Sequence, residues 1–412
     1  MKNKIFLSIM LLLILKGLSA QFIDIRGYAR TYEGILTESG KLAIAQQTLD
    51  MSFEKMGNKS AFKANPVLYL YDTDSLSLKL RELYTDFFFK RFDLRIGKQQ
   101  VVWGKADGVF ITDIVSPLDL REFLLPDFYE IRQGIIATKL NYYIGNSTIE
   151  LIWVSVFTPN ERPQPGSIWY IEPAFPVKPE FNYAKSDISP GIANSEVFMK
   201  YASLGSKIDF ELMGAYTWDD NPSLFTKKIF DTVGGQLVLN QLEIIPEHHR
   251  LGVGGGSFGT EISGVILRGE GAYYHGKYFQ TADPLAEGSL TEKDYLHYLV
   301  GADFSIGNVM LSSQIIQETI LDHDDHILQK QNITTMTFLA QYDLFRETLH
   351  LELFTYLGIT NEDALIRPKI TYDIDDGFSV LLGANIFTGD ASGTFGQYKD
   401  NSMIYTKLKY SF

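Results

Sequence analysis

The sequence contains no cysteine among its 412 residues. Disulfide bonds, thiolate metal ligands, cysteine nucleophiles and a lipid anchor on an N-terminal cysteine are therefore excluded. After residue 20 there is also no apolar run of about eighteen residues, the length that a membrane-spanning helix requires, so a helical membrane protein is not expected. A basic balance is missing as well, because the net charge is −13, and this argues against a nucleic-acid partner.

The first 20 residues have the pattern of a secretory signal peptide. Lysines in the opening “MKNK” precede an apolar stretch at residues 5–14, and “LSA” resembles a cleavage site before Gln21. We expect a mature chain of residues 21–412, and losing the three lysines of the signal peptide takes the net charge from −13 to −16.

Aromatic residues and glycine are abundant, with 23 Tyr, 28 Phe and 34 Gly. Many aromatic side chains without long apolar runs are typical of a transmembrane β-barrel, whose outer face meets lipid while its lumen meets water. A large secreted β-sandwich is the alternative, because its strands also alternate between apolar and polar residues.

Period-two alternation recurs along the chain. In residues 207–218, for example, Ile208, Phe210 and Leu212 lie on one face of the expected strand and Glu211 on the other. The connections favour the barrel over the sandwich, because tight turns alternate with long polar segments, as they do in outer-membrane barrels. The expected tight turns are “YIGN” at 143–146, “SLGS” at 203–206, “SFGT” at 257–260, “SIGN” at 305–308 and “LFRE” at 344–347, and the expected long, irregular loops are 158–195, 219–248, 276–294, 321–332 and 389–401.

If the tight turns lie at the periplasmic end and the long loops at the outer end, parity predicts an all-β, antiparallel transmembrane barrel of about eighteen strands. Sixteen strands are an alternative, because the alternation is weakest at residues 61–89. The predicted strands are 22–34, 42–54, 61–71, 78–89, 92–103, 135–143, 147–157, 196–203, 207–218, 249–257, 261–274, 295–305, 308–319, 333–343, 348–358, 366–374, 377–388 and 402–412.

The last of these strands, “SMIYTKLKYSF”, is the most specific. Ile404, Leu408 and Phe412 lie on its expected lipid face, and Tyr405 and Lys407 on its lumen face. A final alternating strand that ends in Phe resembles the signature by which the barrel-assembly machinery recognises outer-membrane proteins. The first strand follows the predicted cleavage site directly, so no N-terminal plug is expected, and the plugged 22-stranded transporters are excluded by length.

Residues 104–134 interrupt the alternation between two expected strands. The stretch holds too many apolar side chains to leave in water, interspersed with acids and arginines. We expect it to fold back into the barrel and narrow the pore; the alternative is that it only caps the barrel mouth. The residues expected to pack this loop are Phe110, Leu118, Phe123, Leu124 and Phe128, and those expected to line the pore and its constriction are Arg81, Arg95, Gln99, Lys105, Asp107, Asp113, Asp119 and Arg121.

The block “LRELYTDFFFKRFDLRIGKQQVVWGKADGVFITDIVSPLDLREF” resembles the hallmark of a family of Gram-negative outer-membrane proteins without an assigned function. Lys98 and Ser116 depart from the family pattern, which commonly has Arg and Asn there. The resemblance implies an outer-membrane barrel that accompanies RND-type exporters and a periplasmic partner; a more distant similarity to alginate-export porins agrees with eighteen strands. No solute is implied. The matching or similar residues are Leu80, Arg81, Glu82, Tyr84, Leu94, Arg95, Gly97, Lys98, Gln99, Trp103, Gly104, Asp107, Gly108, Asp113, Pro117, Asp119 and Phe123.

Three short motifs offer other chemistry. “LDHDDHILQ” has the His and Asp density of a divalent-ion site, and “YDIDDGF” is similar to a calcium loop but lacks its closing bidentate acid. “PEHHRLG” offers a histidine base, but no GxSxG motif accompanies it and no catalytic triad can be placed. We interpret the three as an external loop, a turn between strands and a loop–strand junction, so no enzyme activity, metal or cofactor is expected.

These features predict a porin in the outer membrane of a Gram-negative bacterium, passing small polar solutes through a lumen narrowed by the 104–134 loop. Its expected partners are outer-membrane lipid, the barrel-assembly machinery and the solute, and the net acidity mildly favours cations. One alternative is a transporter of hydrophobic or lipid-like molecules with periplasmic and RND-type partners. A second is an adhesion or structural barrel whose loops 158–195 and 219–248 bind outside partners. The first alternative would require an apolar groove of Phe110, Leu118, Phe123, Leu124, Leu125 and Phe128.

Overall fold

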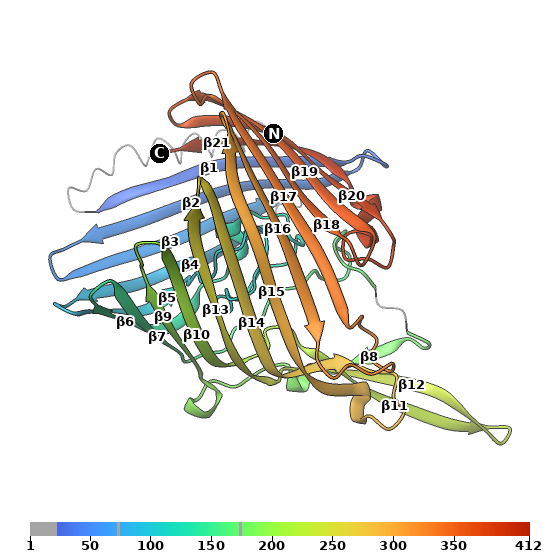
Figure 1. The fold of residues 1–412 in the computed structure, drawn as a ribbon. Coiled ribbons are helices and arrows are strands. Elements are labelled where there is room, and N and C mark those ends of the chain that lie inside the picture. Colours follow the sequence, from blue (N-terminus) through green and yellow to red (C-terminus); the bar gives the residue numbers. More distant parts are fainter. Residues whose placement is uncertain (1–22, 72–74, 173–174) are drawn as a thin grey trace.

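A closed barrel of eighteen antiparallel strands makes up most of the computed structural model, which describes residues 23–71, 75–172 and 175–412 (Figure 1). The predicted eighteen strands are confirmed, and the alternative of sixteen is wrong. The barrel strands are β1 (Asp24–Leu36), β2 (Leu42–Met56), β3 (Ser60–Tyr71), β4 (Leu76–Phe88), β5 (Phe92–Gln99), β6 (Ile135–Ile144), β7 (Ser147–Val154), β9 (Glu196–Ser203), β10 (Ile208–Trp218), β13 (Arg250–Ile262), β14 (Val265–Gln280), β15 (Leu290–Ile306), β16 (Val309–Ile320), β17 (Asn332–Leu344), β18 (Leu349–Gly358), β19 (Asp363–Asp375), β20 (Phe378–Gly389) and β21 (Met403–Ser411).

The ring closes between the first and the last strand. β1 and β21 pair from Tyr28 opposite Ser411 to Leu36 opposite Met403. Closure leaves these two strands without an open edge, which is what a barrel in lipid requires. The predicted faces of the last strand are found as well, because Ile404 is exposed on the outer surface of β21 whereas its neighbour Tyr405 is buried.

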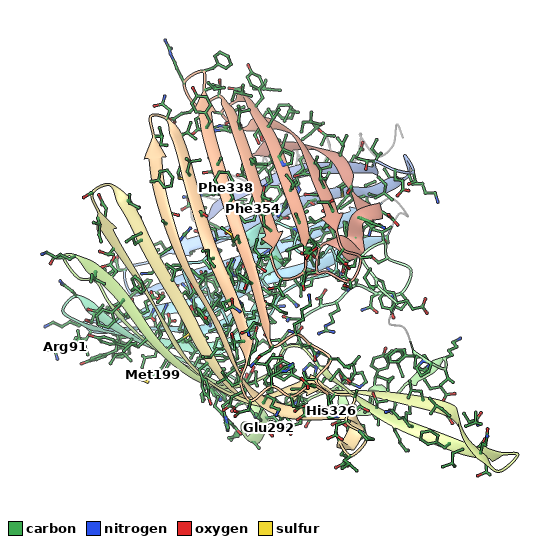
Figure 2. All side chains as sticks on the ribbon, turned by 45° about the vertical axis from the view of Figure 1, so that its right-hand side comes forward. Arg91, Met199, Glu292, His326, Phe338 and Phe354 are labelled. Atoms are coloured by element: carbon green, nitrogen blue, oxygen red, sulfur yellow. The ribbon has the colours of Figure 1, made fainter. Side chains whose placement is uncertain are left out.

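Successive side chains of each strand point to opposite faces of the wall. Phe338 on β17 is 38% exposed on the outer face, whereas Phe354 on the adjacent β18 is 8% exposed and belongs to an interior cluster; Figure 2 labels both residues. On β10 the outward Leu212 and Tyr216 are exposed and Thr217 is buried. The barrel therefore presents an apolar outer surface and an inner surface that carries its polar side chains.

The two ends of the barrel differ in their connections. One end has tight turns such as 145–146 and 376–377, and the other end has the long connections; we term them the turn end and the loop end. The tight turn predicted at 257–260 is wrong, because these residues lie inside β13. The chain turns instead at Ser263 and Gly264, whose φ values are 52° and 81°.

A three-stranded sheet projects from the loop end, at the lower right of Figure 1. β11 (Ser223–Val233) and β12 (Gln236–Glu247) form a hairpin, and β8 (Pro179–Phe181) pairs parallel with β12. The prediction of an irregular loop over this region is therefore wrong. Gly234 and Gly235 make the hairpin turn with positive φ values of 59° and 84°, a geometry that glycine adopts without strain.

The predicted loop at 276–294 is shorter than expected, since β14 and β15 continue into it.

The helical segments of the described residues are short. Among the described residues, no helix is long and apolar enough to cross a membrane. The predicted signal peptide, residues 1–20, lies outside the described residues. The helical turns are α2 (Phe128–Ile131), η1 (Tyr183–Lys185), η2 (Ile192–Asn194), η3 (Glu287–Ser289) and η4 (Gly396–Asn401).

Candidate functional site: the segment between β5 and β6

Residues 100–134, here termed the connecting segment, join β5 to β6. β5 ends before its predicted end at Trp103. The backbone N–H of Val101 donates to Ser116 Oγ at 2.8 Å, and that of Trp103 donates to Asp113 Oδ1 at 3.0 Å. Because side chains of the segment itself satisfy these donors, the chain leaves the sheet here without losing backbone hydrogen bonds.

Glu270 on β14 binds the connecting segment through three hydrogen bonds. Its carboxylate accepts from the backbone N–H of Lys105 and from the N–H and the hydroxyl of Thr112, each at 2.7 Å. The neighbouring Arg268 donates to the Lys105 carbonyl at 3.0 Å and pairs with the Asp107 carboxylate. Hydrogen bonds to buried charges are strong and costly to break, so β14 holds this part of the segment firmly.

β16 and β18 bind the next residues of the segment. The Gln314 side chain accepts from the N–H of Asp107 at 3.1 Å and donates to its carbonyl at 2.9 Å, and the Tyr356 hydroxyl donates to the Gly108 carbonyl at 2.7 Å. Gly108 has a φ of 77°, and a Cβ there would lie 2.5 Å from Phe354 Cζ and 2.6 Å from Tyr356 Oη. Glycine is thus required here by both conformation and space.

Two arginines bind the later part of the segment from neighbouring regions of the wall. Arg367 on β19 donates to the carbonyls of Leu124 at 3.1 Å and Leu125 at 2.8 Å. Arg30 on β1 donates to both carboxylate oxygens of Glu130, at 2.7 and 3.1 Å. The bidentate geometry fixes both position and direction of the Glu130 side chain.

β3 and β4 complete the contacts with the wall. The Tyr129 hydroxyl donates to Asn65 Oδ1 on β3 at 3.2 Å, and the N–H of Gln100 donates to Glu82 on β4 at 3.1 Å. Together with the bonds above, polar side chains of β1, β3, β4, β14, β16, β18 and β19 all reach this one segment.

Apolar side chains of the segment enter three separate buried clusters. Leu125 packs with aromatic residues of β18, β20, β21 and η4. Trp103 and Val115 pack with β6, β7 and β9. Ile111, which has no exposed surface, packs with β13, β14, β15 and β16. The apolar content of the segment is therefore buried against the wall at three places rather than in a core of its own.

The five residues predicted to pack the loop fall into different surroundings. The Phe123 ring is tilted against the Tyr398 ring of η4, with 4.8 Å between the ring centres, and Leu124 packs against the same cluster. Phe110 and Phe128 lie 5.5 Å apart, ring centre to ring centre. Leu118 is held through its backbone, because its N–H donates to Asn160 Oδ1, in the connection between β7 and β9, at 2.6 Å.

Three of the predicted pore residues belong to the wall and not to the segment. Arg81 pairs with Asp50 and is buried. Arg95 donates to both carboxylate oxygens of Asp86, at 2.7 and 3.0 Å. Gln99 is 0% exposed, so its side chain offers no surface to a solute.

Three others are engaged in holding the segment. Lys105 and Asp107 take part in the contact with β14. Asp113 is buried and accepts from Arg132 at 2.6 Å. Burial raises the pKa of Asp113 to about 6, although the Arg132 guanidinium opposes this shift.

The last two, Asp119 and Arg121, form a partly exposed network. Arg121 donates to Asp119 at 2.7 Å, and both join residues outside the segment: Lys79 lies 3.1 Å from Asp119, and Glu161 lies 2.8 Å from Arg121. The predicted residues are thus not brought together into a single constriction. The anchoring side chains that sequence reasoning missed are Arg30, Glu270, Gln314, Tyr356 and Arg367.

Three cavities lined by described residues border the connecting segment. The largest, about 440 Å³, is lined by Arg30, Tyr32, Trp169 and Lys407 among others. A second of about 310 Å³ lies near Arg81. A third of about 230 Å³ combines Phe110, Phe128, Arg367 and Lys369 among its lining residues. All three mix charged and apolar side chains.

The three short motifs lie outside this region. The first follows β16, the second contains the turn from β19 to β20, and the third spans the junction of β12 and β13. No group of three or more His, Asp or Glu residues able to hold a metal ion occurs in the described part of the chain.

Solved structures with the same architecture are outer-membrane-type barrels. Acinetobacter baumannii OccAB1 has a TM-score of 0.55 at 9% identity, over 95% of each chain. A BenF-like porin from Pseudomonas fluorescens Pf-5 has a TM-score of 0.55 at 9% identity, covering 95% of this chain and 97% of that one. Pseudomonas aeruginosa OccK5 (OpdH) gives 0.54 at 10% identity, over 95% and 98%. At these identities the comparison establishes the fold: a porin-like barrel.

The family model described as “Protein of unknown function (DUF1302)” matches residues 70–412, and the chain belongs to this family. The matched range includes the whole motif block on which the family resemblance rests. No curated protein matches the sequence.

Proposed function

We propose that this protein is a channel of the outer membrane through which small polar solutes diffuse, and that the connecting segment lies inside the barrel and narrows its pore. The observation that supports this most directly is the spread of its anchors around the closed ring, from Glu82 on β4 to Glu270 on β14 and Arg367 on β19. A segment bound from strands this far apart around a ring is most simply accommodated within it.

A carrier of hydrophobic or lipid-like molecules, working with periplasmic and RND-type partners, is the alternative. Phe110, Leu124 and Phe128, three of the six residues of the apolar groove that this function requires, line one cavity together, but Leu118, Phe123 and Leu125 are not among its lining residues. The same cavity also presents Arg367 and Lys369, however, and burying such charges against an apolar solute is unfavourable. The mixed lining therefore supports a polar solute.

Planar-bilayer recording of the purified protein tests the proposal. We expect discrete ion-conducting steps from the wild type and a severalfold larger conductance from a variant lacking residues 108–127. A matched variant, in which residues 230–240 of the β11–β12 hairpin are replaced by Asn-Gly, should conduct like the wild type. If none of the three conducts, the channel function is wrong. If only the 108–127 deletion conducts, the segment is a closed plug and the carrier gains support.

A further inference from the structure

Four cationic side chains of one part of the inner wall surround the carboxylate of Asp127. Arg30 comes from β1, Arg367 and Lys369 from β19, and Lys407 from β21. β21 pairs with β1 and with β20, which in turn pairs with β19, so these strands form one continuous arc of the wall. Lys407 Nζ lies 3.5 Å and Arg30 Nη1 4.0 Å from Asp127 Oδ2.

The other acids of this cluster have closer partners than Asp127 has. Glu130 lies 2.7 Å from Arg30, and Glu352 lies 2.8 Å from Lys369. Arg367 donates to backbone carbonyls and to a side-chain amide, and no carboxylate of the described residues neutralises it by a direct bond. The acid nearest to Lys407 is thus Asp127, and the distance between them is longer than in the Arg30–Glu130 and Lys369–Glu352 pairs.

Asp127 is also the most accessible of the three acids. Its side chain is 51% exposed, against 14% for Glu130 and 27% for Glu352. Desolvation by the surrounding chain raises the pKa of Asp127 even though half of its side chain reaches solvent, but Lys407 and the other cations outweigh this and lower the pKa to about 2, so the carboxylate is charged at neutral pH.

Two cavities flank this position. Arg30 and Lys407 line the cavity of about 440 Å³, whereas Asp127 and Lys369 line that of about 230 Å³. Pro126, directly before Asp127, lines both. A solute in either cavity would therefore lie next to cations of the cluster.

We propose that this cluster binds an anionic group of the solute, a carboxylate or a phosphate, which replaces Asp127 as the partner of Lys407 and Arg30. Asp127 acts as a resident counter-ion that the solute displaces when it binds. The proposal rests on the channel function above and specifies its substrate class: small anions. The acidic balance of the whole chain does not oppose this, because selectivity depends on the charges that face the passage.

Calorimetric titration of the full-length protein in detergent, with succinate and with phosphate as separate probes at fixed ionic strength, measures the site without relying on transport. Removing the competing charge in Asp127→Asn should tighten binding about tenfold, and Lys407→Gln should weaken it about tenfold. The control variants Lys200→Gln and Glu211→Gln remove an ion pair of 3.9 Å elsewhere in the inner wall. They should bind both probes as the wild type does. The probe that binds identifies carboxylate or phosphate as the recognised group.

Reversal potentials in a salt gradient complete the test. Asp127→Asn should shift permeability towards anions, and Lys407→Gln towards cations. The anion site is refuted if Asp127→Asn binds neither probe more tightly, even when the channel conducts. A protein that binds an anion as expected but passes no current retains the site and loses the channel function. Lys369→Gln serves as the second charge variant if Lys407→Gln does not fold.

Discussion

The connecting segment and the β11–β12 hairpin are both long connections at the loop end, but they are held by different means. Buried side chains of the wall, such as Glu270 and Arg367, bind the backbone of the connecting segment. The hairpin is stabilised by its own ladder and by ion pairs at its surface, such as Lys185 with Glu247 at 2.7 Å and Lys227 at 3.2 Å from Glu243. Buried charged bonds are costly to lose, while exposed pairs contribute little. The same kind of substitution should therefore reduce stability more in the connecting segment than in the hairpin.

Truncating the principal anchor should have the largest effect. Glu270→Ala leaves the N–H groups of Lys105 and Thr112 and the Thr112 hydroxyl without their acceptor, so we expect a loss of about 3–5 kcal/mol in the free energy of unfolding. Urea unfolding in detergent measures it. Glu270→Gln keeps one acceptor oxygen and should lose less unfolding free energy than Glu270→Ala. A loss no larger than that of Glu243→Ala on the hairpin would remove the distinction between the two regions.

Arg367 should come second. Arg367→Ala leaves the Leu124 and Leu125 carbonyls unpaired, and a charged hydrogen bond contributes about 1.5–3 kcal/mol, so we expect a loss of about 2–4 kcal/mol together with greater current noise as that part of the segment loosens. Arg367→Lys retains the charge but cannot reach both carbonyls in the same geometry. Recovery of wild-type noise by lysine would mean that charge alone positions the segment.

The two regions also contain glycines with positive φ that can be compared directly. Gly108→Ala meets Phe354 and Tyr356 and should destabilise by about 2–4 kcal/mol through backbone strain and overpacking. Gly234→Ala at the hairpin turn has nothing within 4 Å of its new Cβ, so only the strain of about 1–2 kcal/mol applies. Melting curves of the two variants test the difference, and equal shifts would contradict the close approach at Gly108.

The smallest effect is expected at the hairpin surface. Lys185→Ala removes an exposed pair with Glu247, and such pairs contribute little because water and salt screen them, so stability and single-channel conductance should remain close to wild type. A change in conductance would show that the hairpin communicates with the pore.

Alternation and turn spacing predicted the barrel well because both are local properties of the chain. Each of the eighteen predicted strands overlaps a strand of the barrel, and the lumen and lipid faces of the last strand are correct. The errors are local as well. Gly234 and Gly235 separate two strand-like runs, and a Gly-Gly pair in that position is a hairpin signal. The interpretation of this region as an irregular loop did not use that signal. β5 ends early because Asp113 and Ser116 accept hydrogen bonds from its backbone N–H groups. The alternation of apolar and polar residues carries no information about such contacts.

The contacts of the connecting segment could not be predicted in the same way. Alternation assigns Glu270 to a polar face, but its partner Thr112 is separated from it by 158 positions in sequence. Which side chain meets which depends on the register and tilt of the strands around the ring, and these follow from the whole closed sheet. For this reason the sequence points to charged residues within the segment, whereas most of the side chains that anchor the segment belong to the wall strands.

Most of these anchors bind main-chain atoms of the segment: the carbonyls of Gly108, Leu124 and Leu125 and the N–H groups of Lys105 and Thr112. A bond to a carbonyl or an N–H does not depend on the side chain that the residue carries. Accessible positions such as Asp127 and Arg121 can therefore be exchanged without moving the path of the chain. For the channel proposed above, we therefore expect a few substitutions at these positions to change the solute preference while the path of the chain is retained.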